Sequence, residues 1–473
     1  MPMAVTDSMF LLGESREHPT HVGGLQLFRL PEGVGPEYVS DFYRRLLTES
    51  EVAPAMRRRP HRSPATLGQW AWVDDLDIEL DYHVRLSALP RPGRVRELLA
   101  LVSRLHGSLL DRHRPLWEFN LVEGLSENRF ATYTKVHHAL MDGVSAMRVL
   151  TQGLPTDPDA HASPPWAPRP RRSPRRSETN GSTGVLGAAL DAVRDAARVT
   201  TEVVSTPPSI AQALLSIAKD SAAPRPFDAP ATMFNVPIGG ARRFVGQSWP
   251  LQRVQAIGRA ADATVNDVAV AMCSGALRRY LLDHDALPSQ PLVAMLPVSL
   301  RGTGAESSSG SSAGSGAKAG GEGNAVGAIL CDLATEESDP ATRLSRIRAS
   351  TRAGKAMLRG MTPTQVLALS SLLVGGVILA PIPGLGRHTP PPFNLIISNV
   401  PGSREVRYWD GAELLETYPL SIPLDGQAVN ITLTSYVDKL AFGIVGCRRS
   451  VPGLQRLIDH LDAELTALEQ AVG

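Results

Sequence analysis

Residues 158–183 differ sharply in composition from the sequence on either side of them. This segment is rich in Pro, Arg and Ser, and it has too few apolar residues to build a core. A chain of 473 residues is long enough for two or three domains. The break therefore predicts an N-terminal unit over 1–157, a linker with crossover helices over 158–226, and a C-terminal unit over 227–473. The arginines of the linker could contact phosphate, but a solvated linker is the simpler interpretation.

The N-terminal unit mixes the two periodicities of regular secondary structure. Alternating apolar residues predict strands, and apolar residues at helical spacing predict helices. The predicted strands are 22–30, 117–122 and 129–136, and the predicted helices are 36–48 and 94–110. A further amphipathic helix is expected within the crossover, over 184–200.

The C-terminal unit shows the same mixture, so the sequence predicts an α/β fold. Thr264 begins a helix with a good cap, and a Gly/Ser run at 303–323 predicts a disordered loop. The other expected strands are 291–298, 325–333 and 393–400, followed by a hairpin of 429–437 with 440–447 and a closing helix over 454–472.

Composition and charge exclude some function classes. Hydrophobic residues make up 43% and charged residues 20%, and the net charge is +1. Such a chain has no overall attraction to nucleic acid or to an anionic membrane. The three cysteines are far apart and the N-terminal residues form no signal peptide, so we expect free thiols and a cytoplasmic protein.

The uncharged stretch 366–380 has two interpretations. As a helix it would be about 22 Å long, shorter than the roughly 30 Å hydrocarbon core of a membrane. A buried core helix is favoured. The alternative is a surface that enters lipid or lines an acyl tunnel.

The segment with the clearest chemistry is His-His-Ala-Leu-Met-Asp-Gly at 137–143, directly after a predicted strand. Adjacent residues of an extended chain point to opposite faces, so His137 and His138 cannot easily bind one metal ion together. His138 and Asp142 could share a helical face, but the sequence suggests no third ligand nearby. We therefore expect no metal.

Acid–base chemistry suits the segment better. An imidazole is mostly neutral at pH 7 and can accept the proton of an alcohol. One histidine would face a cavity while the other holds the loop, and Asp142 would either orient the base or pair with an arginine and fix the turn. Gly143 would supply backbone angles that other residues avoid. The spacing alone leaves a purely structural histidine pair equally open.

Covalent catalysis has little support in the sequence. Only residues 310–314 match Gly-x-Ser-x-Gly, and they lie inside the Gly/Ser run without a strand before them.

At 137–143 the sequence resembles the HHxxxDG motif of the CoA-dependent acyltransferase superfamily. Six further segments resemble one branch of it, the bacterial bifunctional wax ester synthase/diacylglycerol acyltransferases. These segments occur in family order at 20–24, 115–117, 266–268, 297–301, 323–324 and 398–402.

The resemblance implies two chloramphenicol-acetyltransferase-like domains with a channel at their interface. It implies that His138 is the general base, that His137 supports the loop and that Asp142 is structural. Asn266 and Asp267 would lie near the second half of the site, although a helix cap explains them equally well.

Three further residues of the matched segments have an implied place. Ser398 and Asn399 would help to bind the oxyanion or CoA, and a strand-end turn explains them nearly as well. Trp117, in the segment 115–117, is expected to serve packing.

The implied reaction transfers a long-chain acyl group from acyl-CoA to diacylglycerol or to a long-chain alcohol, giving triacylglycerol or wax ester. It needs no cofactor and no nucleic acid. Contact with the inner membrane or with lipid inclusions would be peripheral. Two alternatives remain: a carrier-protein-dependent acyltransferase of the condensation or polyketide-associated type, and a lipid-binding protein without catalysis.

Overall fold

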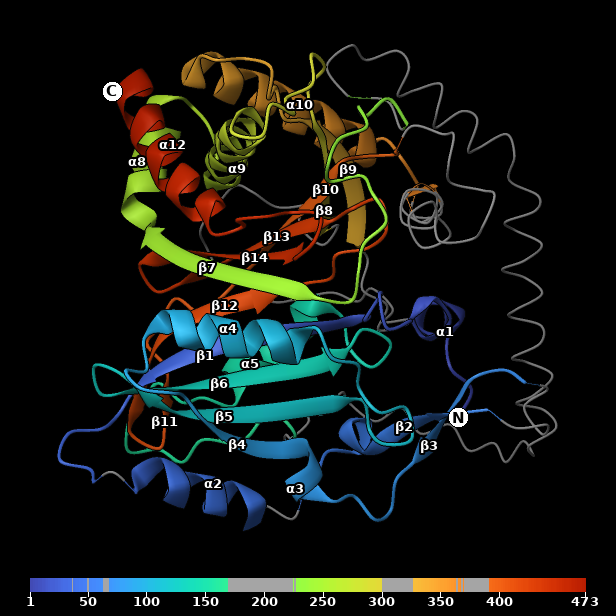
Figure 1. The fold of residues 1–473 in the computed structure, drawn as a ribbon, viewed down its shortest axis with the longest axis vertical. Helices are drawn as coiled ribbons and strands as arrows, with labels where there is room; N and C mark the ends of the chain where they lie inside the picture. The colour runs from blue at the N-terminus through green and yellow to red at the C-terminus, as the bar shows by residue number, and fades with distance from the viewer. Residues whose placement is uncertain are drawn as a thin grey trace, which may run out of the picture.

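A computed structural model gives the fold of the chain (Figure 1). It describes residues 1–35, 37–48, 51–62, 68–168, 224, 227–299, 326–362, 365–366, 369 and 391–473. Within these residues the fold is α/β, as predicted, and consists of two six-stranded sheets with helices packed on them, together with a separate two-stranded hairpin. The predicted helix 184–200, the loop 303–323 and most of the apolar stretch 366–380 lie outside the described residues.

The N-terminal sheet has six strands in the order β11-β12-β1-β6-β5-β4. Only β4 and β5 pair in parallel. The strands are β1 His21–Arg29, β4 Val84–Ala88, β5 Trp117–Leu125, β6 Arg129–His137, β11 Tyr408–Trp409 and β12 Ala412–Leu420. A separate hairpin pairs β2 Arg58–His61 with β3 Ala71–Asp74. The helices of this half are α1 Val5–Gly13, α2 Tyr38–Thr48, the 3-10 turn Pro54–Arg57, α3 Leu80–His83, α4 Val95–His106 and α5 Gly143–Gln152.

The C-terminal sheet also has six strands, in the order β7-β14-β13-β10-β8-β9. Its central strand β10 runs parallel to both neighbours. The strands are β7 Arg242–Pro250, β8 Val293–Ser299, β9 Val326–Asp332, β10 Leu395–Val400, β13 Val429–Tyr436 and β14 Lys439–Cys447. Figure 1 shows α8 Leu251–Ala260, α9 Val265–Leu282, α10 Pro340–Arg359 and α12 Arg456–Val472 over one face of this sheet.

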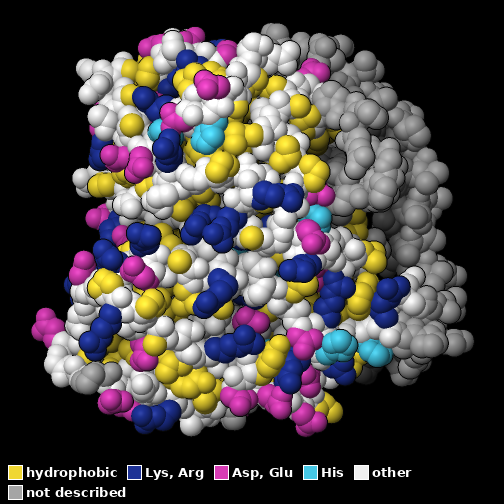
Figure 2. Space-filling model, in the orientation of Figure 1, with side chains coloured by type: hydrophobic (Ala, Val, Ile, Leu, Met, Phe, Trp, Pro, Cys, Tyr) yellow, Lys and Arg dark blue, Asp and Glu magenta, His cyan; other side chains and the backbone are white. Residues whose placement is uncertain are grey.

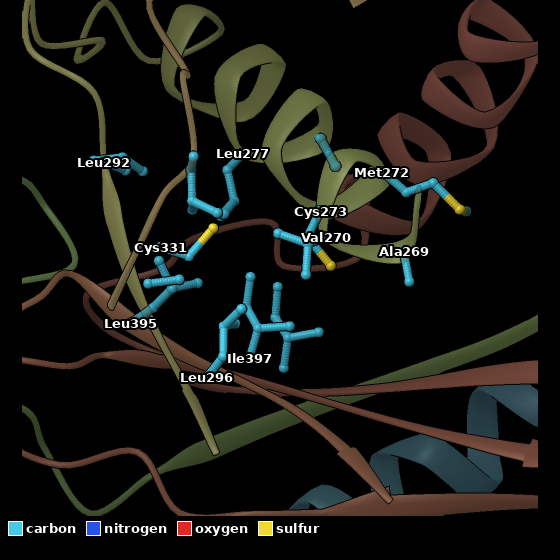
Figure 3. Packing of buried hydrophobic residues seen from close by; sticks show 14 of the residues in the cluster. Ala269, Val270, Met272, Cys273, Leu277, Leu292, Leu296, Cys331, Leu395 and Ile397 are labelled. Carbon is cyan, nitrogen blue, oxygen red and sulfur yellow. The ribbon is translucent and has the colours of Figure 1, made fainter. Parts of the chain in front are cut away.

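Helix α9 is the centre of the C-terminal core. It carries apolar side chains all round, as expected for a helix enclosed by other elements. Figure 3 shows Val270, Cys273 and Leu277 of α9 among side chains of the strands beneath. All three cysteines are buried and free, and burial raises the pKa of the Cys273 and Cys331 thiols.

The two halves share a continuous apolar interface. Phe244 of β7 and Val445 of β14 pack in one cluster with Tyr418 of β12 and Leu98 of α4. The backbones approach closely here: a Cβ added at Gly443 would lie 1.9 Å from the carbonyl oxygen of Pro419. The glycine therefore lets β14 lie directly against β12.

Most predicted elements are confirmed. The elements that were not predicted are α1, α3, α5, α8, α10, the 3-10 turn and the strands β2, β3, β4, β7, β11 and β12. Strand β12 pairs with β1, so the sheet that carries the histidine motif is completed by a strand from the C-terminal part of the chain. Residues 158–168, the first part of the predicted linker, pack on the N-terminal half: the Trp166 ring is fully buried and stacks on Trp117 at 5.5 Å.

The described part of the 366–380 stretch agrees with a core helix, because Val366 and Leu369 are buried in the C-terminal core. Within the described ranges, no helix has the length and apolar character needed to cross a membrane.

Candidate active site

The histidine motif lies where β6 ends and α5 begins. His137 is the last residue of β6, and α5 begins at Gly143. On the neighbouring strand β1, His21 lies opposite His137. Thr20 comes directly before His21 in the sequence. The Thr20 carbonyl accepts a hydrogen bond of 2.9 Å from the His138 amide, so β1 fixes the backbone of the motif.

His137 is completely buried at the end of β6, and its role in supporting the loop stays a prediction. Its Nδ1 accepts a 3.0 Å hydrogen bond from the Ala139 amide. The proton of the neutral ring is therefore on Nε2, which lies 3.0 Å from the Thr20 hydroxyl and 3.4 Å from the Glu14 carboxylate. This set of hydrogen bonds holds the turn that follows β6.

Glu14 joins His137 to the N-terminal segment. Its carboxylate accepts a 3.0 Å hydrogen bond from Arg112 Nε and another of 3.3 Å from the Thr20 amide. Burial opposes ionisation of the Glu14 carboxyl, but the hydrogen bonds from His137, Arg112 and Thr20 outweigh it and lower its pKa.

His138 is half-buried and stands apart from this hydrogen-bonded group. Its ring stacks on the ring of Phe10, with centroids 4.1 Å apart and planes 21° apart. Loss of hydration lowers the pKa of His138 to about 4, although the nearby Asp142 carboxylate acts in the opposite direction. The imidazole is therefore neutral at physiological pH, in the form that can accept a proton.

Asp142 caps helix α5. Its carboxylate accepts hydrogen bonds from the Ser145 amide at 2.7 Å and from the Ser145 hydroxyl at 3.2 Å. The expectation for Gly143 was wrong, because Gly143 begins α5 without a positive φ. A Cβ there would meet only Val22, at 3.9 Å. The backbone conformation of the motif does not require glycine at this position.

Helix α5 connects the motif to the C-terminal half. Its residues Met147 and Leu150 form an apolar cluster with Val400, the last residue of β10. Helix α5 therefore links the histidine loop to the end of β10, where Ser398 and Asn399 lie.

Two of the predicted substrate-binding residues contact each other, and one of them lines a pocket of the C-terminal half. Asn399 Nδ2 donates to Asn266 Oδ1 over 3.3 Å. Asn399 also lines a pocket of about 510 Å³, together with Arg404, Ser403 and Val265 among others. Ser398 is half-buried and is not among the lining residues.

Asp267 is placed as a helix cap. Its carboxylate accepts hydrogen bonds from the Thr264 amide at 2.9 Å and from the Thr351 hydroxyl at 2.7 Å, and its side chain is buried. This is the helix-cap interpretation that the sequence left open. Substrate binding by Asn266, Asp267, Ser398 and Asn399 stays a prediction, and so does the channel between the halves.

Three residues of the site had no signal of their own in the sequence: Phe10, Glu14 and Arg112. They reach the histidines only through the pairing of β1 with β6 and the docking of α1, which are long-range contacts. The segment 20–24, which the resemblance singled out, pointed to this neighbourhood.

Comparison with known proteins places this geometry in one family. The model of the wax ester synthase/diacylglycerol acyltransferase catalytic domain matches residues 3–269, and that of the WS/DGAT C-terminal domain matches residues 322–469. The chain is 50% identical over 474 residues to the probable diacylglycerol O-acyltransferase tgs2 of Mycobacterium tuberculosis, covering 100% of this chain and 99% of that one. A second M. tuberculosis protein, provisionally named for the same activity, is 49% identical over 472 residues and all of both chains.

Solved structures agree. The wax ester synthase/diacylglycerol acyltransferase from Marinobacter aquaeolei VT8 matches with a TM-score of 0.77 and 38% identity over all of both chains. The starter condensation domain of rhizomide synthetase shares the fold alone, with a TM-score of 0.54 and 13% identity over 100% of this chain and 94% of that one. The chain therefore belongs to the wax ester synthase/diacylglycerol acyltransferase family of acyltransferases.

Proposed function

We propose that this enzyme transfers a long-chain acyl group from acyl-CoA to the free hydroxyl of diacylglycerol, with His138 as its general base. The observation that carries the proposal is the state of His138: a half-buried, neutral imidazole at the end of β6, with its backbone fixed by Thr20. The names of the relatives supply the acceptor, because tgs2 of M. tuberculosis is named as a probable diacylglycerol O-acyltransferase. The family name adds a long-chain alcohol as a second acceptor.

The chemistry needs one proton acceptor and no covalent enzyme intermediate. A nitrogen of His138 takes the proton of the acceptor hydroxyl while the hydroxyl oxygen attacks the carbonyl carbon of the thioester. The tetrahedral intermediate then expels the CoA thiolate, which receives the same proton from His138. The products are the ester and free CoA, and the base returns to its neutral form.

The test is an assay of purified enzyme with palmitoyl-CoA and either diacylglycerol or hexadecanol, which follows CoA release and the lipid product together. His138→Ala should lower kcat/KM at least about 100-fold, the usual contribution of a general base. The matched control is His113→Ala, because the His113 side chain is 93% exposed.

Retained activity in His138→Ala would contradict the assignment of the base. Absence of CoA release with both acceptors, even in the wild-type enzyme, would instead favour a carrier-bound acyl donor. Competition between acyl-CoA and an acylated carrier protein separates these donors.

Peripheral contact with a membrane or a lipid inclusion is part of the proposal, since diacylglycerol is dissolved in lipid and not in water. Flotation of the enzyme with vesicles that contain diacylglycerol tests this contact. Recovery of all the enzyme in the lipid-free fraction would contradict it.

A further inference from the structure

The N-terminal helix α1 contacts both histidines of the motif, and the two contacts differ in kind. Glu14, directly after the helix, holds His137 through its carboxylate. Phe10, within the helix, lies flat against the ring of His138. Glu14 therefore helps to fix the loop, whereas Phe10 touches the side chain that would accept the proton.

We propose that Phe10 is a positioning residue for His138, which holds the imidazole plane in place and keeps water from one of its faces. The proposal rests on the assignment of His138 as the base. Phe10 itself contacts no reacting atom in this mechanism, so its effect would be exerted through the histidine.

The geometry of the stack suits such a role. An imidazole accepts and donates protons at its ring nitrogens, in the plane of the ring. A ring stacked at 4.1 Å with an interplanar angle of 21° covers a face and leaves the edge with the nitrogens accessible. Phe10 therefore limits rotation of the imidazole without obstructing proton transfer.

Phe10 is itself firmly anchored. Its carbonyl accepts a 3.1 Å hydrogen bond from the Thr20 hydroxyl. The next residue, Leu11, is buried in a cluster with Leu116 and Ala139, and the Leu11 carbonyl accepts a 2.9 Å hydrogen bond from Arg112. A side chain on so fixed a backbone can hold a neighbouring ring in one orientation.

The electrostatic effects at His138 have opposite signs. The carboxylate of Asp142 favours the charged imidazolium, and the neighbouring His137 disfavours it. An aromatic face also attracts a cation. The net result is a pKa of His138 lowered to about 4, so loss of hydration outweighs the effects that favour the charged form. Removal of Phe10 should rehydrate the ring and raise this pKa towards its ordinary value of about 6.5.

The experiment is the pH dependence of kcat/KM for CoA release between pH 5.5 and 8.5. The wild-type enzyme should show no loss of neutral base over this range. If the pKa of His138 in Phe10→Ala reaches about 6.5, activity at pH 6 should be about fourfold lower than at pH 8, and at pH 5.5 about tenfold lower. Phe10→Tyr keeps the ring and should restore the wild-type profile.

Two further variants keep the test decisive. Leu12→Ala changes the same helix at a side chain that is 65% exposed, and it should leave the profile unchanged. Phe10→Leu keeps apolar volume but not the flat ring, so it replaces Phe10→Ala if melting curves show that the alanine variant is unfolded. The kcat/KM of Phe10→Leu should also fall at low pH, but to a smaller extent than that of Phe10→Ala.

A loss of activity that is equal at every pH, or an unchanged profile in both Phe10→Ala and Phe10→Leu, would overturn the proposal. The result for His138→Ala separates this failure from failure of the proposed function. If that variant is inactive and the Phe10 profiles match wild type, only the role of Phe10 is lost.

Discussion

At the scale of single residues, the two adjacent histidines have different environments because β6 ends between them. His137 is still part of the strand, and its ring lies in a closed hydrogen-bonded group with Thr20 and Glu14. His138 is the first residue of the loop and meets an aromatic ring instead. One histidine is therefore held by polar contacts, and the other by a ring stack.

The carboxylate of Glu14 should contribute stability that depends on pH. Its folded pKa is lowered, so its contribution is fully present above the unfolded pKa of about 4.3 and is lost as the pH falls through the folded pKa. Glu14→Gln keeps the shape but loses hydrogen bonds to a charged group. It should lower the free energy of unfolding at pH 7 by about 1–3 kcal/mol.

Denaturant titrations at pH 7 and near pH 4 measure this effect. The difference from wild type should be smaller at the lower pH, and a difference that stays constant would contradict the pKa argument. Glu405→Gln is the control, because Glu405 pairs with Arg407 but its side chain is 69% exposed.

At the scale of elements, α5 is the short helix on which both halves meet. Its N-terminus is fixed by Asp142, and its apolar side packs against Val22 of β1 and Val400 of β10. The orientation of the histidine loop therefore depends on how well this helix begins.

Replacing Asp142 separates capping from charge. Asp142→Ala should cost about 1 kcal/mol of stability and reduce activity, since alanine cannot cap the helix. Asp142→Asn keeps a good capping group, so it should stay close to wild type in Tm and in kcat/KM at pH 8. An asparagine variant as impaired as the alanine variant would show instead that the negative charge itself is needed.

The sequence predicted the elements whose signals are local. Alternation marked β5 and β6, and the capping residue Thr264 marked the start of α9. Strand β12 was missed because its stability comes from pairing with β1, almost 400 residues earlier, and its sequence contains two glutamates and a proline. The same physics limits how much of the site the sequence can predict. A local sequence motif identifies His138, whereas the stack of His138 on Phe10 arises only from tertiary packing.

At the scale of the whole molecule, the two sheets are joined by an apolar interface and by an exchanged strand. Acidic and basic side chains are interspersed over the face shown in Figure 2, which fits the net charge of +1. The association of the halves therefore depends on close packing between β14, β7, β12 and α4.

Gly443→Ala tests that packing. The new methyl group would lie far inside contact distance of the Pro419 carbonyl, so β14 and β12 would have to separate. Overpacking of this kind costs about 1–3 kcal/mol, and the Tm should fall accordingly. Gly35→Ala is the control, because a Cβ there meets nothing within 4 Å. Equal melting temperatures for the two variants would show that the interface is looser than described.

The exchanged strand also has a consequence for synthesis on the ribosome. The strand β1 is synthesised almost 400 residues before its partner β12, which ends at Leu420. At a synthesis rate of roughly 5–20 residues per second, the edge of β1 that pairs with β12 stays unpaired for about 20–80 s. An unpaired edge is a template for pairing with other chains. Nascent chains of this enzyme should thus depend on chaperones until β12 has been synthesised.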